Sequence, residues 1–556
     1  MSAASQNSTP LGLPLTIESM NQAVGEQSAG DRRLPTPSRR GFLQGTLAAA
    51  AGVTLISKAA PVRAQTAAAP EHHRAIIIGS GFGGGVTANR LAQAGIETLV
   101  IERGIWWKTG PNAETFSHAA NPDKRSSWLS NTTTSGVPAV FDKYTGIIER
   151  VKGNGIDIMC AAAVGGGSLN YHGMTIQPSE ANFTRDIPGI DYGPMNSIYY
   201  PRVAQVLQPN VLPDDLWKND AYQSSRVVAQ AITDAGYQPW KIPLPIDWNF
   251  ARMELNGKAK PAYTNSDIVY GVNNGGKRTV DVTWLKSAMD TGKCAVVTQH
   301  IVRDISRTKD GKWLVKADRI DTAGNVQENK QFIADALFLG AGSAGTTRLL
   351  VKAKNKNLIS NLPDAVGKNW GTNGDRIYLV HEALGKDWGQ QGGPANIGVK
   401  FWDDPAGPFT IVHGTVNILV PTGMATIIGY GSVKPLGSFK YDSGQDDAIV
   451  QWSDSYDSDL VTRIRTQVDK IFNNKPGAAV IDENATDNVT WHALGGATMG
   501  AVCDYFGRVQ GQKGLYVIDG SFIPGSTGAC NPSFTIAALA ERSMDDILKK
   551  DVGSVF

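Results

Sequence analysis

The clearest hydrophobic pattern in the chain is an uninterrupted apolar run at 75–78 that leads directly into a glycine-rich turn. A helical pattern follows the turn, and a second apolar run at 99–101 ends in the carboxylate of Glu102. Continuous apolar strands on either side of a helix are typical of a βαβ unit whose parallel sheet is covered on both faces. We therefore predict a strand, a helix and a second strand over residues 75–102.

The glycines of this turn follow the spacing Gly79-x-Gly81-x-x-Gly84. Within a βαβ unit this spacing is typical of a dinucleotide site. The first glycine permits a tight turn, the second lets the backbone approach a pyrophosphate, and the third lets the helix pack closely on the strand. Glu102 is placed to accept hydrogen bonds from a ribose diol. The pattern predicts a bound dinucleotide, with a purely structural turn as the alternative, and it does not separate NAD from FAD.

Later patterns predict two further kinds of structure. Alternating apolar and polar positions at 409–420 and 424–433 predict strands of an antiparallel sheet. Residues 191–274 are rich in Pro, Tyr and Trp and have no such rhythm, which indicates a cap with irregular connections. In chain order, the other predicted elements are strands within 294–320 with a hairpin turn at 309–312, a strand at 336–340, a helix at 346–354, a strand at 515–519 and a helix at 533–550.

The segment before the βαβ unit has the pattern of an export signal. Residues 1–37 are polar, and Arg39-Arg40 then precedes an apolar run at 47–56 and small residues up to Ala64. A twin-arginine pair followed by such a run is typical of signals that export folded proteins, and the run is short for a transmembrane span. We predict an export signal at 1–64 and a periplasmic or secreted protein without a transmembrane span, with an ordinary N-terminal helix as the alternative.

Composition excludes few function classes. The chain has 556 residues, a formal net charge of +2 and no long basic run, so nothing in it indicates a nucleic acid partner. Its four cysteines are Cys160, Cys294, Cys503 and Cys530, and none forms a CxxC pair. No metal site or redox motif is therefore predicted. We expect these cysteines to be small buried hydrophobic residues, although an exported protein can form a disulfide that the sequence does not assign.

Four separated blocks carry a resemblance to a known family. They are Gly79-Ser-Gly-Phe-Gly-Gly84, Gly165-Gly-Gly-Ser-Leu-Asn-Tyr-His-Gly-Met174, Leu339-Gly-Ala-Gly-Ser343 with Trp370-Gly-Thr-Asn-Gly374, and Trp491-His492-Ala-Leu-Gly-Gly496 with Asp519-Gly520-Ser521 and Asn531-Pro532. In order and spacing these blocks resemble the glucose–methanol–choline (GMC) oxidoreductases, and within them the bacterial cholesterol oxidases. The resemblance covers about residues 74–375 and 485–556 and is much looser over 376–484.

The resemblance implies an α/β fold with two domains. A Rossmann-like FAD-binding domain would be discontinuous, and an α+β substrate-binding domain would be built on an antiparallel sheet. The first would take residues 71–190, 275–375 and 485–556, and the second residues 191–274 and 376–484. Cofactor pieces scattered along the chain favour FAD over a nicotinamide cofactor, since a nicotinamide Rossmann domain is usually one continuous block.

The reaction implied by the family is oxidation of an alcohol to a carbonyl by hydride transfer to flavin N5. His492 falls on the family's active-site histidine, and an imidazole can accept the hydroxyl proton near neutral pH. Asn531 falls on the partner position, where its amide would bond the substrate oxygen or the flavin edge. The pair Asn531-Pro532 also predicts a helix N-cap followed by the first helical residue.

The expected substrate is a small-molecule alcohol, a 3β-hydroxysteroid such as cholesterol or another apolar alcohol. Oxygen or a periplasmic electron carrier would reoxidise the flavin. A nicotinamide-dependent dehydrogenase and a non-catalytic binding protein remain as alternatives. The family implies that FAD is contacted by Gly79, Gly81, Phe82, Gly83, Gly84, Glu102, Gly165, Gly166, Ser168, Asn170, Tyr171, His172, Gly173, Met174, Val302, Gly340, Asp519, Gly520, Asn531, Pro532 and Phe534.

Two positions depart from the family pattern. Ile411 stands where the related cholesterol oxidases carry a glutamate over the flavin, so we predict that steroid isomerisation is absent. For the nearby His413 the pattern favours a core or surface role, with a second active-site base as the alternative. Tyr171-His172 replaces smaller residues in the glycine-rich loop, and a covalent bond from His172 to the flavin is the alternative to non-covalent binding.

Overall fold

The computed structural model describes residues 70–381, 391–415, 424–473 and 478–556, and the predicted βαβ unit opens its first sheet. Strand β1 (Glu71–Ile78) pairs in parallel with β2 (Thr98–Ile101) on one side and with β9 (Val326–Leu339) on the other. Beyond β2 lies β6 (Cys294–Val297), also parallel. The apolar runs of the sequence thus become the buried centre of this sheet.

Strand β9 is long enough to have two different neighbours on its second edge. Its first part pairs antiparallel with β8 (Trp313–Ile320), which pairs in turn with β7 (His300–Arg307). Its last part pairs in parallel with β18 (Leu515–Val517). The hairpin turn predicted at 309–312 is confirmed, since Thr308 N–H donates to the Lys312 carbonyl at its base.

Three long helices accompany this sheet. Helix α2 (Phe82–Gln93) contacts β1, β2 and helix α12 (Ser533–Lys550), whose bounds are those predicted. Helix α10 (Gly342–Asn355) follows β9 and packs against β7. Glycine lets α2 approach the sheet closely: a Cβ at Gly83 would lie 1.8 Å from the Ile518 carbonyl oxygen, a distance no other residue type permits.

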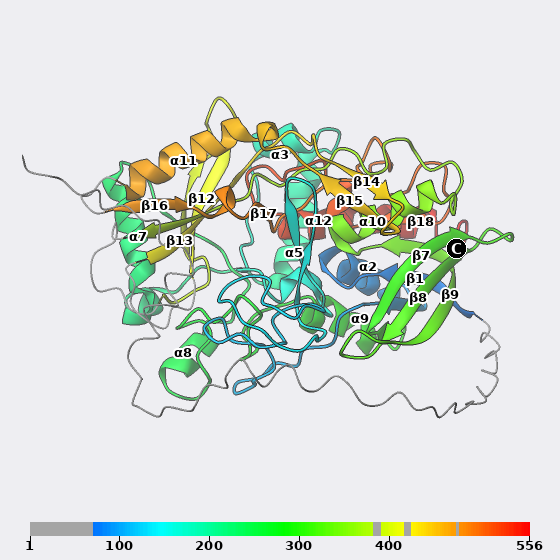
Figure 1. Cartoon of the computed structure of the whole chain (residues 1–556), viewed down its shortest axis with the longest axis horizontal. Coiled ribbons are helices and arrows are strands. Elements are labelled where there is room, and N and C mark those ends of the chain that lie inside the picture. Colours follow the sequence, from blue (N-terminus) through cyan, green and yellow to red (C-terminus); the bar gives the residue numbers. More distant parts are fainter. Residues whose placement is uncertain (1–69, 382–390, 416–423, 474–477) are drawn as a thin grey trace, which may run out of the picture. The chain divides into compact units, whose positions relative to one another are not determined.

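The second sheet is antiparallel, as predicted, and draws strands from separated parts of the chain. Its order is β16 (Ala479–Asp482), β10 (Arg376–His381), β13 (Met424–Gly431), β12 (Phe409–Gly414), β11 (Ile397–Phe401) and β5 (Trp240–Lys241). Helices α11 (Ser458–Phe472) and α7 (Gln223–Asp234) cover one face, and Figure 1 shows α11 lying over β12 and β13. The other face of this sheet borders the cavity described below.

The remaining elements are short. A small sheet joins β3 (Ile148–Val151), β4 (Asp157–Ala161) and β17 (Val489–Thr490), and β14 (Ser438–Asp442) forms a hairpin with β15 (Asp447–Gln451). The short helices are η1 (Gly166–Ser168), α3 (Glu180–Asp186), α4 (Tyr192–Pro194), η2 (Met195–Tyr199), α5 (Tyr200–Leu207), α6 (Asp214–Trp217), η3 (Asp220–Tyr222), α8 (Asn249–Leu255), η4 (Asp281–Leu285), α9 (Lys286–Asp290), η5 (Asp454–Tyr456), η6 (Glu483–Ala485) and η7 (Gly520–Phe522). Residues 191–274 therefore consist of α7, several shorter helices and the two-residue strand β5, joined by irregular connections as predicted.

Several predictions fall wholly or partly outside the part of the chain that the structure describes. The export signal at 1–64 lies outside it, as do the last positions of the strand predicted at 409–420. Among the helices that are described, none is both long enough and apolar enough to cross a membrane. The division into FAD-binding and substrate-binding domains stays a prediction.

Candidate active site

One cavity, of about 810 Å³, lies where the two large sheets meet. The carboxyl ends of β1 and β2 form one wall through Ile78 and Ile101, and β10 and β13 contribute Ile377 and Ile428 to another. Ligands of open α/β sheets bind outside the carboxyl ends of the parallel strands, where loops and helix N-termini converge. The βαβ turn opens directly into this cavity.

Each glycine of the βαβ turn is explained by a different feature of the local geometry. Gly79 has a φ of +92°, and a Cβ there would lie 2.4 Å from the Gly340 carbonyl oxygen. A Cβ at Gly84 would lie 2.1 Å from the Gly79 carbonyl oxygen, so Gly84 is needed for helix-on-strand packing. A Cβ at Gly81 would meet no atom within 4 Å, so the space in front of its backbone is open to the cavity.

Glu102 lies at the end of β2 on the cavity wall, buried and already hydrogen-bonded. Its carboxylate accepts hydrogen bonds from Ser80 N–H at 3.1 Å, from Ser80 Oγ at 2.6 Å and from Gly104 N–H at 2.9 Å. A carboxylate has about four acceptor sites, so these bonds orient Glu102 and leave capacity for one further donor such as a ribose hydroxyl.

Most residues of the predicted site share this one cavity. The wall includes Gly79, Gly81, Phe82, Gly83, Glu102, Gly166, Asn170, Tyr171, His172, Met174, Val302, Gly340, His492, Asp519, Gly520, Asn531 and Pro532. They come from segments more than four hundred residues apart in the chain, between Gly79 and Pro532. The structure therefore brings the scattered sequence blocks together.

Five predicted contact residues do not line the cavity, and most of them support residues that do. Gly84 packs on the βαβ turn, as described above. Ser168 Oγ donates to the Gly165 carbonyl at 2.7 Å and accepts from Val280 N–H at 3.0 Å, and Gly165 has a φ of +102°, so these two shape the start of loop 165–174. Gly173 lies in the same loop with a φ of +83°. Phe534 is buried in α12 against Tyr200.

The most specific arrangement on the wall is a histidine held by a carboxylate. His492 Nδ1 lies 2.7 Å from Asp375 Oδ1, and the Asp375 side chain is only 4% exposed. A carboxylate can only accept here, so the proton resides on Nδ1 and the lone pair on Nε2. Because His492 lines the cavity, Nε2 is the ring nitrogen available to a molecule bound there.

Asp375 also holds the backbone that carries this histidine. Its Oδ2 accepts hydrogen bonds from Trp491 N–H at 2.9 Å, from His492 N–H at 3.0 Å and from Thr490 Oγ1 at 3.0 Å. Asp375 is not among the site residues predicted from the sequence. The available signal was its place directly after the Trp370–Gly374 block and before the strand that becomes β10.

Asn531 lines the cavity, but one of the two roles predicted for it is wrong. Its Nδ2 donates to the Met174 carbonyl and, at 2.8 Å, to Ser533 Oγ, which leaves Oδ1 buried and without a partner among the residues described. The prediction that Asn531 is a helix N-cap is wrong: α12 begins at Ser533, and Pro532 occupies the N-cap position. Its amide is instead used to bridge α12 and the Met174 backbone.

On β12 the predicted position of Ile411 over the flavin is wrong, whereas the core role favoured for His413 is the one observed, because successive side chains of a strand face opposite sides. Ile411 packs with Tyr378 and Ile464 under α11, on the sheet face away from the cavity. His413 is two residues further along the strand, so its side chain lies on the same face as that of Ile411. It is fully buried and does not line the cavity, so a role as a second base there is not supported. Burial lowers the pKa of His413 to about 3, which keeps its imidazole neutral.

The carboxylates on the cavity wall are almost all committed to other groups. Asp519, whose pKa is raised by burial, accepts from Gly342 N–H at 2.8 Å and from Ser521 N–H at 2.9 Å. Glu149 pairs with Arg103, and Asp447 pairs with Arg348. Among the described residues, no group of His, Cys, Asp or Glu side chains is arranged to hold a metal ion, and all four cysteines are free.

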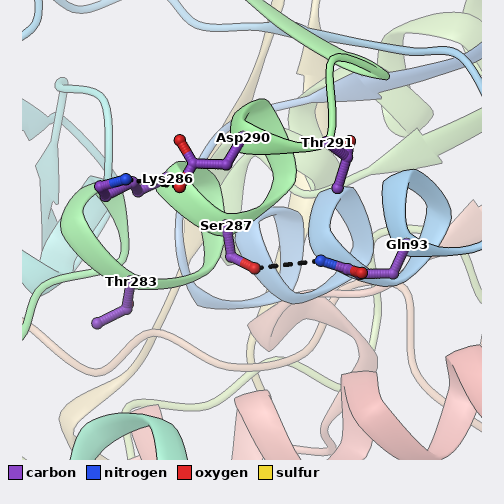
Figure 2. Close-up of a pocket in the computed structure, with 6 residues that line it drawn as sticks. All are labelled: Gln93, Thr283, Lys286, Ser287, Asp290 and Thr291. Carbon is purple, nitrogen blue, oxygen red and sulfur yellow. Dashed lines mark hydrogen bonds and ion pairs between the residues drawn. The ribbon is translucent and has the colours of Figure 1, made fainter.

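A second, smaller hollow of about 330 Å³ lies outside the cavity and shares no residue with it. Figure 2 shows Gln93 of α2 facing Ser287 of α9, with Lys286 and Asp290 paired on the same turn of α9. Its lining residues make these contacts with one another, and none of them belongs to the predicted site.

Comparison with known proteins gives concordant results. Residues 445–540 match a family model described as GMC oxidoreductase. Cholesterol oxidase from Mycobacterium tuberculosis (strain CDC 1551 / Oshkosh) is 25% identical over 545 residues, covering 84% of this chain and 90% of that protein. Cholesterol oxidase from Acinetobacter baumannii is 23% identical, covering 85% of this chain and 94% of the relative.

Relatives with other substrates match over a similar span. A 2-methyl-1,2-propanediol dehydrogenase from Mycolicibacterium austroafricanum is 22% identical over 85% of this chain and 95% of the relative. Among solved structures, pyridoxine 4-oxidase from Mesorbium loti aligns with a TM-score of 0.59 at 15% identity, over 86% of this chain and 99% of that one. This structural match supports the fold alone.

Proposed function

We propose that this chain, a GMC-type oxidoreductase that acts on alcohols, binds FAD in its cavity and oxidises an apolar alcohol at His492. The observation that carries the proposal is the hydrogen bond between His492 Nδ1 and Asp375, which reserves Nε2 for the substrate hydroxyl. A lone histidine on a cavity wall would not distinguish a catalytic role from a structural one. A histidine oriented by a buried carboxylate has the arrangement of a general base.

The residues of the cavity fit FAD. Open space lies in front of the Gly81 and Gly167 backbones, where an added Cβ would meet no atom within 4 Å, so a pyrophosphate can approach them and the N-terminus of α2. Glu102 keeps an acceptor site for the ribose. When bound, FAD supplies the acceptor for the hydride that leaves the alcohol carbon. We propose non-covalent binding, with His172 as the residue that would carry a covalent bond.

The chain's own groups would handle the hydroxyl proton. His492 Nε2 accepts it as the carbonyl forms, and the Asp375 carboxylate stabilises the resulting imidazolium. Asn531 Oδ1 is a second acceptor on the cavity wall, because its two N–H groups are already donated to the Met174 carbonyl and to Ser533 Oγ. The alcohol has a single hydroxyl proton, which can go to only one acceptor, and we assign it to Nε2 of His492.

The substrate side of the wall favours an apolar alcohol. Ile377, Ile428, Met174, Trp491 and Val269 present hydrophobic surface to the same cavity as His492. A 3β-hydroxysteroid such as cholesterol is the proposed substrate, and relatives named cholesterol oxidase support it. The alternative is a non-steroid alcohol, supported by the match to a diol dehydrogenase.

We still propose that the protein lacks steroid isomerase activity. Ile411 no longer supports this, because its side chain lies away from the cavity, and the support comes from the carboxylates instead. Among the cavity-lining carboxylates that the structure describes, only Asp375 contacts His492, and it is fully engaged in orienting that histidine. No free carboxylate is therefore offered to move a steroid proton.

We also propose export through the twin-arginine signal and reoxidation by oxygen or by a periplasmic electron carrier. Replacing Arg39 and Arg40 by lysine should leave the protein in the cytoplasm, as measured by immunoblotting of periplasmic and cytoplasmic fractions. Unchanged export of that variant would contradict the signal.

The central experiment is a spectrum followed by an alcohol panel. The purified protein should show flavin absorbance, and should oxidise members of a panel that includes 3β-hydroxysteroids, assayed in parallel with oxygen and with an artificial electron acceptor. The His492→Ala variant should keep its flavin and lose turnover, whereas His72→Ala, at an exposed histidine paired with Asp335, should keep both. A colourless protein that requires added NAD would overturn the proposal.

A further inference from the structure

A buried lysine lies beneath loop 165–174, which forms part of the cavity wall. Lys277 is 4% exposed, and its Nζ donates to the Leu169 carbonyl at 2.8 Å and to the Tyr171 carbonyl at 2.6 Å. Its ammonium also lies 5.0 Å from the centre of the Tyr171 ring. It forms no ion pair with any carboxylate in the described ranges, and Asp281 acts on it only at longer range.

The two carbonyls that Lys277 binds determine where two amide groups point. In a trans peptide the C=O and the following N–H point in opposite directions. Because the carbonyls of Leu169 and Tyr171 face Lys277, the N–H groups of Asn170 and His172 face away from it. Neither N–H donates to a backbone or side-chain acceptor in the described part of the chain, and both residues line the cavity.

This part of the wall lies at the reacting end of the cavity. Burial lowers the pKa of His172 to about 4, and the charges of Lys277 and of His492 act in the same direction. The loop ends at Met174, whose carbonyl accepts from Asn531 and whose sulfur contacts Tyr430, the ring that packs edge-on against His492. Burial also lowers the pKa of Lys277 itself to about 7, so a negatively charged ligand would favour its protonated form.

We propose that Lys277 is a positioning residue that directs the amide N–H groups of Asn170 and His172 into the cavity and makes this wall a binding site for the electron-rich edge of a flavin ring. The inference rests on the proposed FAD site. It assigns the ligand class as an anionic or polarised heterocycle, held by two backbone donors with a cation behind them.

Sulfite binding to the flavin-loaded protein tests whether the Lys277 ammonium acts on the flavin. The affinity for sulfite depends on positive charge near the flavin ring, and it is measured without substrate turnover. Lys277→Met should weaken sulfite binding by about tenfold or more and lower the flavin reduction potential, since a nearby unit charge is removed from a poorly solvated site. Lys277→Gln keeps a donor for one carbonyl but removes the charge, and it should show the same loss. The control, Lys286→Met, removes an exposed lysine that pairs with Asp290 on α9 (Figure 2) and should change neither quantity.

A measurement on the unmodified chain covers the case in which both variants fail to fold. On adding FAD to the apoprotein, the amides of segment 169–174 should become protected from hydrogen exchange. Sulfite affinity within twofold of the unmodified protein in a flavin-loaded Lys277 variant, or equal exchange of this segment with and without FAD, would overturn the inference. A protein that binds no FAD at all would instead overturn the proposed function.

Discussion

His492 Nδ1 lies 2.7 Å from Asp375 Oδ1, although the two residues are 117 positions apart in the chain. The carboxylate also accepts both backbone N–H groups of Trp491 and His492, so one buried side chain fixes the position, the orientation and the tautomer of the imidazole. In the proposed reaction, an imidazole held in this way would need little reorganisation when the proton transfers, which is the physical advantage of preorganised polar groups.

Replacing Asp375 by asparagine should reduce kcat while FAD remains bound. The amide can keep one hydrogen bond to the His492 ring but offers no negative charge to the imidazolium, so we expect a loss of about 10²-fold or more in kcat. Steady-state kinetics, with flavin content measured in parallel, would test this loss. Normal turnover in the flavin-loaded variant would show that the carboxylate is only structural.

Replacing Asn531 by alanine should affect both turnover and stability. The cavity wall loses a polar acceptor, and the buried Met174 carbonyl loses the shorter of its two side-chain donors, leaving Ser533 Oγ at 3.4 Å, which costs about 0.5–1.5 kcal/mol of unfolding free energy. Helix α12 should keep its length, because its N-cap is Pro532. Urea titration and kinetics would separate the two effects; full stability in the variant would contradict the bridging role.

Replacing Gly81 by valine tests the cofactor cradle without disturbing the fold. Gly81 has a φ of −70° and no atom near an added Cβ, so a larger residue is tolerated by the protein but occupies the space proposed for the pyrophosphate. FAD affinity should fall by about tenfold or more, at least about 1.4 kcal/mol. The matched control is Gly110→Val, another glycine with open space, which lies outside the cavity wall. Equal flavin content in the two variants would place the pyrophosphate elsewhere.

The stability of the chain should depend on pH through His118. Burial lowers the pKa of His118, but hydrogen bonds to Asp267 and Glu114 outweigh it, so the pKa is raised overall. A group whose folded pKa is raised stabilises the protein fully below its unfolded pKa, about 6.5, and this stability is lost as pH rises through the folded value. His118→Gln should therefore lower the Tm at pH 5.5 and have a smaller effect at pH 8.5. The reverse order in thermal scans would contradict the ion-pair geometry.

Cholesterol, if accepted, should give the unconjugated 3-ketosteroid as its main product. The carboxylates on the described cavity wall are committed to backbone, hydroxyl or cationic partners, so no base is free to move the double bond. Product analysis by chromatography with ultraviolet detection would measure this. A conjugated enone as the main product would show that another group performs the isomerisation.

Local patterns were sufficient for much of the fold. The helix at 533–550 has strong periodicity and clear ends, the strand before it is a short apolar run, and the glycine turn at 79–84 is required by its own geometry. The sequence could not show which side of the sheet each side chain of β12 occupies, because a shift of one residue in a strand moves every side chain to the other side. Ile411 was placed in a real strand but on the wrong face.

The candidate site was partly predictable for a related reason. His492 and Asn531 stand in blocks whose spacing is informative, so both could be named from the sequence. Asp375 acts through a loop more than a hundred residues away, and nothing local to it indicates that contact. Lys277 could not be identified from the sequence either. Nothing in its local sequence indicates burial, and the side chain becomes buried only because the loop at 165–174 folds over it.

The pairing of β18 with β9, and of α12 with α2, has a consequence for the order of events in the cell. Synthesis makes the βαβ turn first and reaches Asn531 only after the next four hundred and fifty residues or so, at a rate of roughly 5–20 residues per second. A nascent chain therefore carries an incomplete nucleotide cradle for tens of seconds. Under the proposed function, flavin loading would follow synthesis of this last segment and precede translocation, so the supply of free flavin in that interval would limit how much active enzyme a cell obtains.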